Sequence, residues 1–331
     1  MLGESGQVVE EGSVANNRVA LSELSSHYPG ALIVMEAGCH SPWVSRHLEQ
    51  AGCEVIVSNP RKTRAIYQHE RKSDRRDALM LARIARMEPA LLYPVRHGSE
   101  EAQQDLLRIK LRDSLVRVRV GLINSVRFTL KSLGYAMANP STERFHKASK
   151  SALPESIVQM IAPSVQAIEE LSLRIKLLDQ EIRTLAHSKY PETTWLEQIP
   201  GVGPITALYF VLKIGDPARF KRVRDVGAFI GLCPRRDQSG ESDPQLRISK
   251  RGDAYLRRLL VSSAQYILGP FAPPSALRQY GLALATGATA PSQEACRGSR
   301  GPQTGRAALN AVENQKRLSS IPPAVRKNED P

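Results

Sequence analysis

Two short apolar segments constrain the fold of this chain more than any other feature. Residues 31–36 form a continuous apolar run that ends in Glu36, and residues 54–58 form a second such run. Runs of this kind are typical of buried strands in a parallel sheet. Between them, Ser41 predicts the cap of a helix and Gly52 its end. Strand, helix and strand at this spacing form a βαβ unit, so we expect the two strands to be parallel and adjacent.

The residues upstream of this unit predict two further elements. Residues 7–14 read as two short strands around a tight turn at Glu11 and Gly12. Asn17 predicts the cap of a helix that runs to about His27.

Three carboxylates form a candidate metal site. Glu36 lies at the carboxyl end of its strand, where α/β sheets bind ligands. Ser73 predicts a helix cap, and Asp74 and Asp77 then share the first turn of that helix. Oxygen ligands of this type suit Mg²⁺ or Mn²⁺, which assist phosphoryl transfer. Glu36 also fits an ordinary solvated position, and both aspartates also suit the helix dipole.

Seven basic residues surround these acids in the sequence, which favours a site that holds a phosphodiester. They are Arg61, Lys62, Arg64, Arg71, Lys72, Arg75 and Arg76.

Two long helices are predicted over residues 99–133 and 155–187, separated by a polar break. The first helix carries a rough apolar stripe: Leu106, Leu111, Leu115, Val118, Leu122, Val126, Leu130 and Leu133. The second carries a heptad pattern: Ile161, Ile168, Ile175 and Ile182 at one position, with Leu171, Leu178 and Leu185 at the other. The pattern predicts an antiparallel coiled-coil hairpin or a dimerisation element, with an ordinary helical bundle as the alternative.

A glycine-rich turn follows between two apolar helices. Ile199–Ala207 contains Gly201 and Gly203, and it matches a helix-hairpin-helix pattern. Glycines at such a turn let backbone N–H groups approach a phosphate. The sequence therefore predicts nucleic-acid binding at Gly201 and Gly203.

A polar loop follows at Asp237–Asp243, and basic residues lie on both sides of it. Arg235, Arg236, Lys250 and Arg251 are candidate nucleic-acid contacts. Ser239 lies in the loop beside a glycine, where a serine most often serves as a turn residue. Asp253 predicts the cap of a last helix that ends near Leu268.

The charge of the chain favours a polyanionic partner. Lys and Arg number 46 against 33 Asp and Glu, a formal charge of +13, which suits nucleic acid or an anionic membrane surface. No apolar run approaches the ~20 residues that span a bilayer. Cys39, Cys53, Cys233 and Cys296 are scattered without a CxxC pair, so we expect reduced thiols in the cytoplasm, without zinc or disulfides.

The predicted fold class is α/β plus α, in four parts. Residues 1–97 form an α/β domain, 98–190 a helical coiled-coil connector and 191–270 a helical C-terminal domain with the helix-hairpin-helix-like motif. Residues 271–331 form a tail, and we expect it to be largely disordered from Gly281 on because it is rich in Gly, Ala, Ser, Pro and Arg.

With these motifs in order, the chain resembles the DEDD-type insertion-sequence transposases, relatives of the Piv DNA invertase and of RNA-guided bridge recombinases. The resemblance covers residues 5–285. Its most specific parts are Lys72–Leu79 and the series from Ile199 to Leu260, which includes Gly231–Pro234, Gln238–Glu241 and Arg247–Asp253.

The resemblance implies a fold and a mechanism. The N-terminal domain is expected to be RuvC-like, of the RNase H type, with four acids that bind two Mg²⁺ ions; Glu36, Asp74 and Asp77 match the second, third and fourth. Ser239 matches the family's nucleophile, which attacks a scissile phosphate and forms a covalent phosphoserine link. Expected partners are DNA, a second copy or more of the chain and, in some members, a structured guide RNA encoded beside the gene. The expected location is the cytoplasm, with the nucleoid and no membrane.

The sequence departs from the family pattern at both ends. No aspartate precedes Asp74, so the sequence lacks a match to the family's first acid: either the start is misplaced and the protein is longer, or this copy lacks a complete metal site. A sheet without the central strand that carries this acid is expected to be poorly stable. Residues 297–309 replace the family's apolar C-terminal helix, which suggests a frameshift. Three functions remain open: an active transposase or recombinase, a non-catalytic nucleic-acid-binding remnant, and a RuvC-type junction nuclease that works without Ser239.

Overall fold

The structure is a computed structural model that describes residues 1–63, 73–135, 140–148, 153–244 and 246–287. The chain divides into two compact units, Met1–Glu101 and Ala102–Pro331. Among the helices in these ranges, none combines the length and the apolar character that a membrane span requires.

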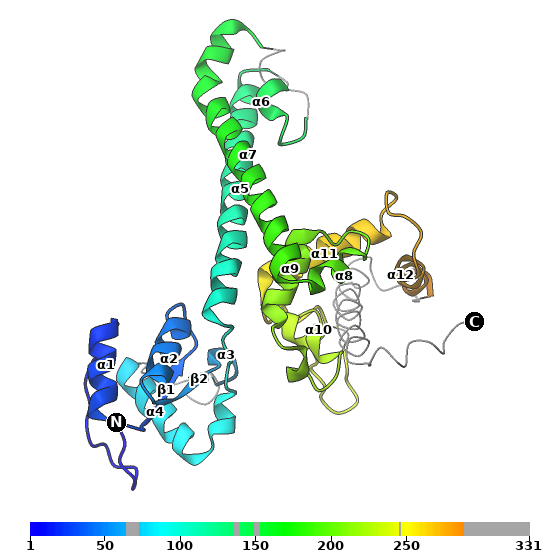
Figure 1. Cartoon of the computed structure of the whole chain (residues 1–331). Coiled ribbons are helices and arrows are strands. Elements are labelled where there is room, and N and C mark those ends of the chain that lie inside the picture. The colour runs from blue at the N-terminus through cyan, green and yellow to red at the C-terminus, as the bar shows by residue number, and fades with distance from the viewer. Residues whose placement is uncertain (64–72, 136–139, 149–152, 245, 288–331) are drawn as a thin grey trace, which may run out of the picture. The chain divides into compact units, whose positions relative to one another are not determined.

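The first unit contains a small parallel sheet with helices around it (Figure 1). Its elements are α1 (Arg18–His27), β1 (Leu32–Glu36), α2 (Ser41–Gln50), β2 (Glu54–Ser58), α3 (Pro60–Thr63), α4 (Asp74–Met87) and the 3-10 helix η1 (Pro89–Leu92). The strands are parallel and pair from Leu32 opposite Glu54 to Glu36 opposite Ser58. The predicted βαβ unit is therefore confirmed, and no further strand joins β1 and β2 among the residues that are described.

The two faces of the sheet pack against different helices. Val34 and Ile56 contact the buried side of α4 and η1, which includes Leu81 and Leu92. The alternate residues Ile33, Met35 and Val55 contact the cluster of Leu21, Leu48 and Cys53 from α1, α2 and the start of β2. Because side chains alternate along a strand, each residue of β1 is assigned to one of these two layers.

In the first unit, the capping residue was predicted correctly for α1 and α4 and wrongly for α2. Asn17 accepts a hydrogen bond from Ala20 N–H, and Ser73 accepts one from Arg76 N–H, as predicted. His40, however, precedes α2 as its cap residue without a side-chain bond, and Ser41 is already the first helical residue. The Ser41 hydroxyl instead bonds within the turn before the helix.

The predicted hairpin at residues 7–14 is wrong. The only backbone pairing near the N-terminus within the described ranges is an isolated antiparallel bridge between Leu2 and Val8. The turn lies at Glu4–Gly6, where Gly6 has φ +85°. Glu11 and Gly12 lie in irregular backbone after this bridge.

The second unit is helical. Its first helix, α5 (Glu100–Ser132), begins two residues before the boundary between the units. The elements that follow are α6 (Phe145–Ala148), α7 (Glu155–Lys189), α8 (Glu192–Glu197), α9 (Pro204–Ile214), η2 (Pro217–Arg219), α10 (Asp225–Ile230), α11 (Ala254–Leu268) and α12 (Ala276–Gly287). The two long helices were predicted within two residues at most ends. They lie side by side over much of their length (Figure 1), and a cluster that includes Ile123, Leu130, Ile161 and Ile168 fills the space between their distal ends.

The heptad isoleucines and the α5 stripe had different outcomes. Ile161, Ile168, Ile175 and Ile182 are all buried, as the heptad pattern predicted. On α5 the outcome is mixed: Leu106, Val126 and Leu130 of the predicted stripe are buried, whereas Leu111, Val118 and Leu133 are exposed.

The buried face of α5 also includes charged residues, and two of these, Asp105 and Asp113, accept hydrogen bonds from residues further along the chain. Asp105 accepts from Lys189 Nζ at 2.6 Å and from the Tyr190 hydroxyl at 2.7 Å. Asp113 accepts from Arg258 at 2.7 Å. A prediction from apolar residues alone does not find Asp105 and Asp113, because burial of these charges depends on partners far along the chain.

One core joins the base of the long helices to the C-terminal helices. Leu106 and Ile182 contact a cluster that includes Leu208 of α9, Ile230 of α10 and Leu260 of α11. The predicted boundary at residue 190, between the helical connector and the C-terminal domain, stays a prediction. Residues on both sides of it contribute to this core.

The last described helix falls in the predicted tail. α12 extends to Gly287, although no regular structure was predicted from Gly281 on. Residues 288–331, which include Cys296 and the suspected frameshift, lie outside the described residues.

Candidate active-site elements

The candidate acid Glu36 is the last residue of β1 and is exposed. Strand alternation assigns its side chain to the layer of Val34, which packs against α4. Glu36 therefore belongs to the side of the sheet that α4 covers.

Asp74 and Asp77 both lie in the first turn of α4, and Asp77 is half-buried. The predicted shared turn is confirmed, but the three acids are not gathered at one point. Among the described residues, no group of three or more His, Cys, Asp or Glu side chains could hold a metal ion. The donor atoms suit Mg²⁺, whereas their arrangement in this structure does not form its site.

Two of the neighbouring basic residues have partners away from the acids. Arg75 forms an ion pair with Glu11. Lys62 Nζ lies 4.3 Å from the centre of the Tyr93 ring. Arg64, Arg71 and Lys72 lie outside the described residues, so their prediction stays untested.

A histidine that was not predicted lies close to the strand end. His97 Nε2 is 3.0 Å from the Ser41 hydroxyl, which also donates to the Gly38 carbonyl at 2.9 Å. These bonds fix the turn that follows Glu36. Burial, together with the positive charge of Arg46, lowers the pKa of His97. An isolated histidine gives no sequence pattern, because its partner lies 56 positions away.

The two candidate glycines of the second unit differ in role. They lie in the turn between α8 and α9, as predicted, and Gly201 has φ +81°. A Cβ at Gly201 would lie 2.8 Å from the Tyr266 side chain and 3.1 Å from the Ser263 carbonyl oxygen. Close packing against α11 therefore requires this glycine. No atom lies within 4 Å of a Cβ built at Gly203, so the backbone before α9 is open there.

Two separate sequence motifs come together as a short ribbon. Ser249 N–H donates to the Cys233 carbonyl at 2.8 Å, and Arg235 N–H donates to the Arg247 carbonyl at 3.0 Å. Pro234 and Ile248 form the bridge between these bonds. We call residues 233–235 and 247–249 the ribbon.

The base of the ribbon is a contact of backbone against backbone. A Cβ at Gly231 would lie 1.7 Å from the Arg251 carbonyl oxygen, and one at Gly252 would lie 2.1 Å from the Phe229 carbonyl oxygen. Both glycines also have positive φ, +79° and +81°. No side chain fits at either position, which explains why glycine occurs there.

Ser239 lies at the end of the loop that the ribbon carries. Its N–H and carbonyl exchange two hydrogen bonds with Ser242, each of 3.0 Å, around a turn at Gly240 and Glu241. Gly240 has φ +57°, which glycine adopts without strain. Ser239 is exposed. The hydroxyl is thus presented to solvent by a closed two-residue turn.

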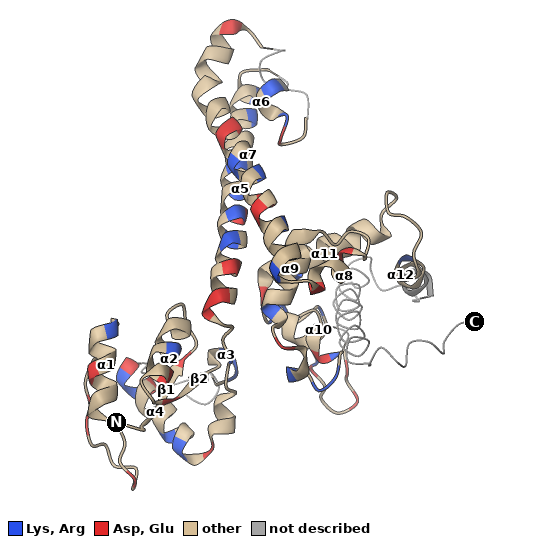
Figure 2. Cartoon of the chain, viewed as in Figure 1, with Lys and Arg blue, Asp and Glu red and all other residues tan. Residues whose placement is uncertain are grey.

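Basic residues occur in the chain near α10, together with some acidic ones (blue and red in Figure 2). One pocket is lined by Pro234, Arg235, Arg236, Ser249 and Arg251. Three of the four predicted basic contacts therefore share a pocket, whereas Lys250 does not line it and has φ +53°. Arg236 also forms an ion pair with Asp243 at 3.2 Å across the loop.

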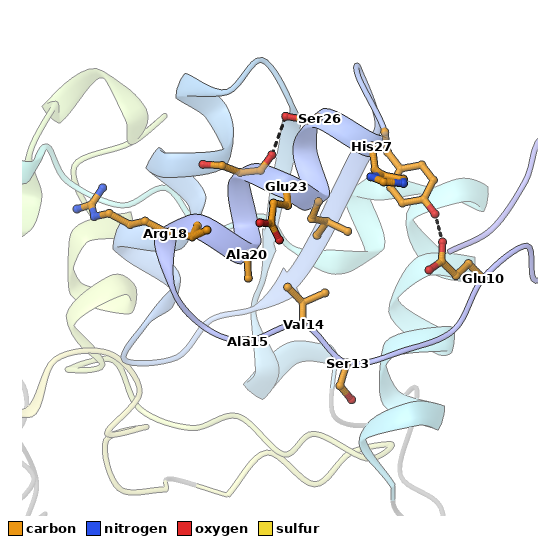
Figure 3. A pocket seen from close by; sticks show the side chains of 13 residues that line it. Glu10, Ser13, Val14, Ala15, Arg18, Ala20, Glu23, Ser26 and His27 are labelled. Carbon is orange, nitrogen blue, oxygen red and sulfur yellow. Dashed lines mark hydrogen bonds between the residues drawn. The ribbon is translucent and has the colours of Figure 1, made fainter.

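A larger, open pocket lies beside α1 (Figure 3). It is lined by residues of α1 and of the preceding segment, such as Val14, Arg18 and His27, and Tyr28 donates a hydrogen bond to Glu10 at its edge. None of the predicted site residues lines it.

Comparisons with known proteins identify the family. A family model described as transposase of the IS116/IS110/IS902 family matches residues 193–280, and a transposase model of the IS110 DEDD type matches residues 1–134. The chain is 30% identical over 255 residues to the transposase of IS1111A from Coxiella burnetii, covering 75% of this chain and 68% of that protein. It is also 30% identical over 253 residues to the IS1328 transposase from Yersinia enterocolitica, covering 75% and 74%.

The chain belongs to the IS110/IS116/IS902 family of transposases. The IS110 DEDD model covers the first unit and α5, and the IS116/IS110/IS902 model covers α8 to α11 with the ribbon. Membership in a DEDD transposase family implies, in general, a requirement for a divalent metal. The recognition made from the sequence is therefore confirmed for the family.

Proposed function

We propose that this family member cleaves and rejoins DNA strands with Ser239 as the nucleophile. The observation that supports this role most directly is the position of Ser239: exposed, beside Gly240, in a hydrogen-bonded turn carried by an arginine-rich ribbon. A nucleophile for a DNA phosphate must be accessible, and cations nearby must offset the charge of the backbone.

In each step of the proposed reaction one ester bond to phosphorus forms and one breaks, so no redox partner is needed. Ser239 Oγ attacks the phosphorus, an Oγ–P bond forms and the bond from phosphorus to the 3′-oxygen breaks. The serine proton passes to solvent, and the leaving 3′-oxygen takes up a proton. In the second step a 3′-hydroxyl of another strand attacks the phosphoserine, and Ser239 regains its proton. The phosphate remains esterified throughout, so strands can be exchanged without hydrolysis.

Glu36, Asp74 and Asp77 are proposed as acids of the DEDD site, with Mg²⁺ or Mn²⁺ as the metal. A divalent metal supplies charge for the attacking and leaving oxygens in such reactions. Among the described residues these acids do not form a three-ligand group.

The test is to trap a covalent protein–DNA adduct. We expect full-length protein incubated with DNA of its own element and Mg²⁺ to form an adduct that resists denaturant, and Ser239→Ala to form none. Ser242→Ala is the matched control, because Ser242 contributes backbone bonds to the same turn and should retain the adduct. An adduct that persists in Ser239→Ala contradicts the proposed nucleophile.

The same assay separates the two alternatives. A junction nuclease would cleave DNA without any adduct and would retain cleavage in Ser239→Ala. A binding-only protein would bind DNA and neither cleave nor form an adduct; the absence of a three-acid group among the described residues favours this reading over the nuclease.

Coiled-coil packing of α5 and α7 is a further part of the proposal and rests on the heptad pattern of α7. Two more parts, a homo-oligomer and a structured guide RNA, come from the family resemblance. Light scattering of the purified protein tests the oligomer. Extraction and sequencing of RNA that copurifies with the protein tests the guide, and its absence after expression of the complete element would count against it.

A further inference from the structure

The pocket at the ribbon is lined by both arms of the ribbon. Pro234 and Ile248 form the bridge pair, and Ile248 packs against the apolar core of the second unit. Pro234, Arg235 and Arg236 line the pocket from one arm, and Ser249 and Arg251 line it from the other side.

The positive charge at the ribbon is only partly balanced by acids of the chain, since Arg236 pairs with Asp243. Arg235 N–H bonds to the Arg247 carbonyl, so these two arginines are direct cross-strand neighbours. Within the described residues, no acidic side chain pairs with Arg235, Arg247 or Arg251. Like charges directly opposite each other destabilise a pair of strands. An anion bound at the ribbon would remove this cost.

Ser249 gives the pocket a neutral donor. Its side chain is half-buried, and its oxygen lies 3.5 Å from Arg251 N–H, at the limit of a hydrogen bond. The hydroxyl hydrogen can therefore be donated to a ligand. No carboxylate lines the pocket.

This set of groups matches one ligand chemistry. Guanidinium groups and a hydroxyl donor suit the two non-bridging oxygens of a phosphodiester, which carry one negative charge and accept hydrogen bonds. A carboxylate ligand would match as well in charge, but DNA offers phosphodiesters in a continuous row, and DNA is the partner of the family.

We propose that Ser249, with Arg235 and Arg251, binds a single backbone phosphate of DNA. This phosphate is not the one that Ser239 attacks, because Ser239 does not line the pocket. The pocket holds a neighbouring phosphate and thereby fixes the strand relative to the loop. The inference relies on the proposed function only in taking DNA as the partner.

The experiment measures DNA binding by the full-length chain in EDTA, where no strand cleavage occurs. The probe is a fluorescent duplex, titrated at several salt concentrations. Ser249→Ala is expected to weaken binding about tenfold or more, since it removes one hydrogen bond to a charged group. The slope of log affinity against log salt should not change, because the substitution removes no charge.

Two control substitutions and one rescue make this result specific. Ser242→Ala removes a hydroxyl outside the pocket and should bind as the unsubstituted protein does. Arg251→Gln should weaken binding and reduce the salt slope by about one. Arg224→Gln removes the same charge from an exposed position outside the pocket and should change the slope less. Ser249→Thr keeps the hydroxyl and should restore affinity if the loss in Ser249→Ala is not a folding defect, which circular dichroism checks.

Three outcomes would overturn the inference. One is binding by Ser249→Ala equal to that of Ser242→Ala. Another is a weakened Ser249→Ala that Ser249→Thr does not restore. The third is Ser249-dependent binding of an RNA of the same sequence with no such dependence for DNA. Failure of the Ser239 mechanism is distinguishable, because it would appear in the adduct assay, as no adduct or as one that persists in Ser239→Ala, without altering binding in EDTA.

Discussion

The hydroxyl of Tyr209 on α9 donates to the carboxylate of Asp253 at 3.1 Å, just before α11 begins. The same carboxylate accepts from Leu256 N–H at 2.9 Å and from Lys213 Nζ at 2.9 Å. Burial alone would raise the pKa of Asp253, but these three bonds outweigh it and lower the pKa. Asp253 thus joins α9 to α11 and fixes the residues before it, including Arg251.

Replacement of Asp253 should therefore destabilise the second unit. Asp253→Ala removes a helix cap and leaves Lys213 and Tyr209 without their acceptor, for an expected loss of about 2–4 kcal/mol. Tyr209→Phe should cost about 1 kcal/mol. Urea unfolding followed by Trp195 fluorescence in a Trp43→Phe background reports on this unit. A loss for Asp253→Ala no larger than that for the exposed cap variant Asp216→Ala would contradict the prediction.

The buried acid Asp105 should contribute more stability than a half-exposed one. Its side chain is 4% exposed, and Lys189 and Tyr190 both donate to it. Asp105→Ala is expected to cost about 2–3 kcal/mol, because Lys189 loses its partner in a partly buried position. Asp179→Ala, which breaks the more exposed pair with Arg112, should cost under about 1 kcal/mol.

The pH dependence of the stability of Asp105→Ala gives a second test of this ion pair. Burial raises the pKa of Asp105, but the bonds from Lys189 and Tyr190 lower it below its ordinary value of 3.8. A carboxyl whose folded pKa is lowered stabilises the fold above its unfolded pKa and loses that contribution as pH falls through the folded value. The stability difference between the unsubstituted chain and Asp105→Ala should be constant near neutral pH and shrink below about pH 4. A difference that grows on acidification would be inconsistent with this ion pair.

His97 should make the first unit sensitive to mild acid. Burial lowers its pKa from the ordinary 6.5, so the unfolded chain binds the proton more tightly than the folded one. Stability is then fully present above pH 6.5 and decreases as pH falls through the lowered value. Thermal unfolding followed by Trp43 fluorescence, in a Trp195→Phe background, should show this decrease between pH 7 and 5. His97→Gln should flatten it, and His27→Gln, at an exposed position, should leave it unchanged.

The glycines of the second unit should differ widely in tolerance. Gly231→Ala places a Cβ 1.7 Å from a backbone oxygen in a positive-φ residue, so we expect a loss above about 3 kcal/mol or no folded protein. Gly203→Ala meets no atom within 4 Å and should cost less than about 1 kcal/mol. Soluble yield and urea midpoints measure both. Equal effects at the two positions would show that the close contact is not rigid.

Predictions from the sequence were correct for strands β1 and β2, several helix caps and the buried face of α7, which depend on residues close together in the sequence. The strands ending at Glu36 and Ser58, the cap at Ser73 and the cap at Asp253 all follow from neighbours in the sequence, and the structure has them. The heptad isoleucines predicted a buried face on α7 for the same reason.

Long-range pairings account for most of what the sequence analysis missed. The buried face of α5 includes Asp105 and Asp113 because Lys189 and Arg258 lie 84 and 145 positions further on. Ser41 was assigned a capping role, yet its hydroxyl lies next to His97. The pocket at Ser249 depends on the pairing of two motifs that the sequence separates, so Ser249 was not singled out.

The contact between Gly231 and Arg251 has a consequence for the loop between them. Two backbones that touch without side chains set the distance between the ends of residues 232–250. Loop closure depends only weakly on the number of residues enclosed. We therefore expect changes of length in the loop beyond the ribbon to leave the helices on either side in place.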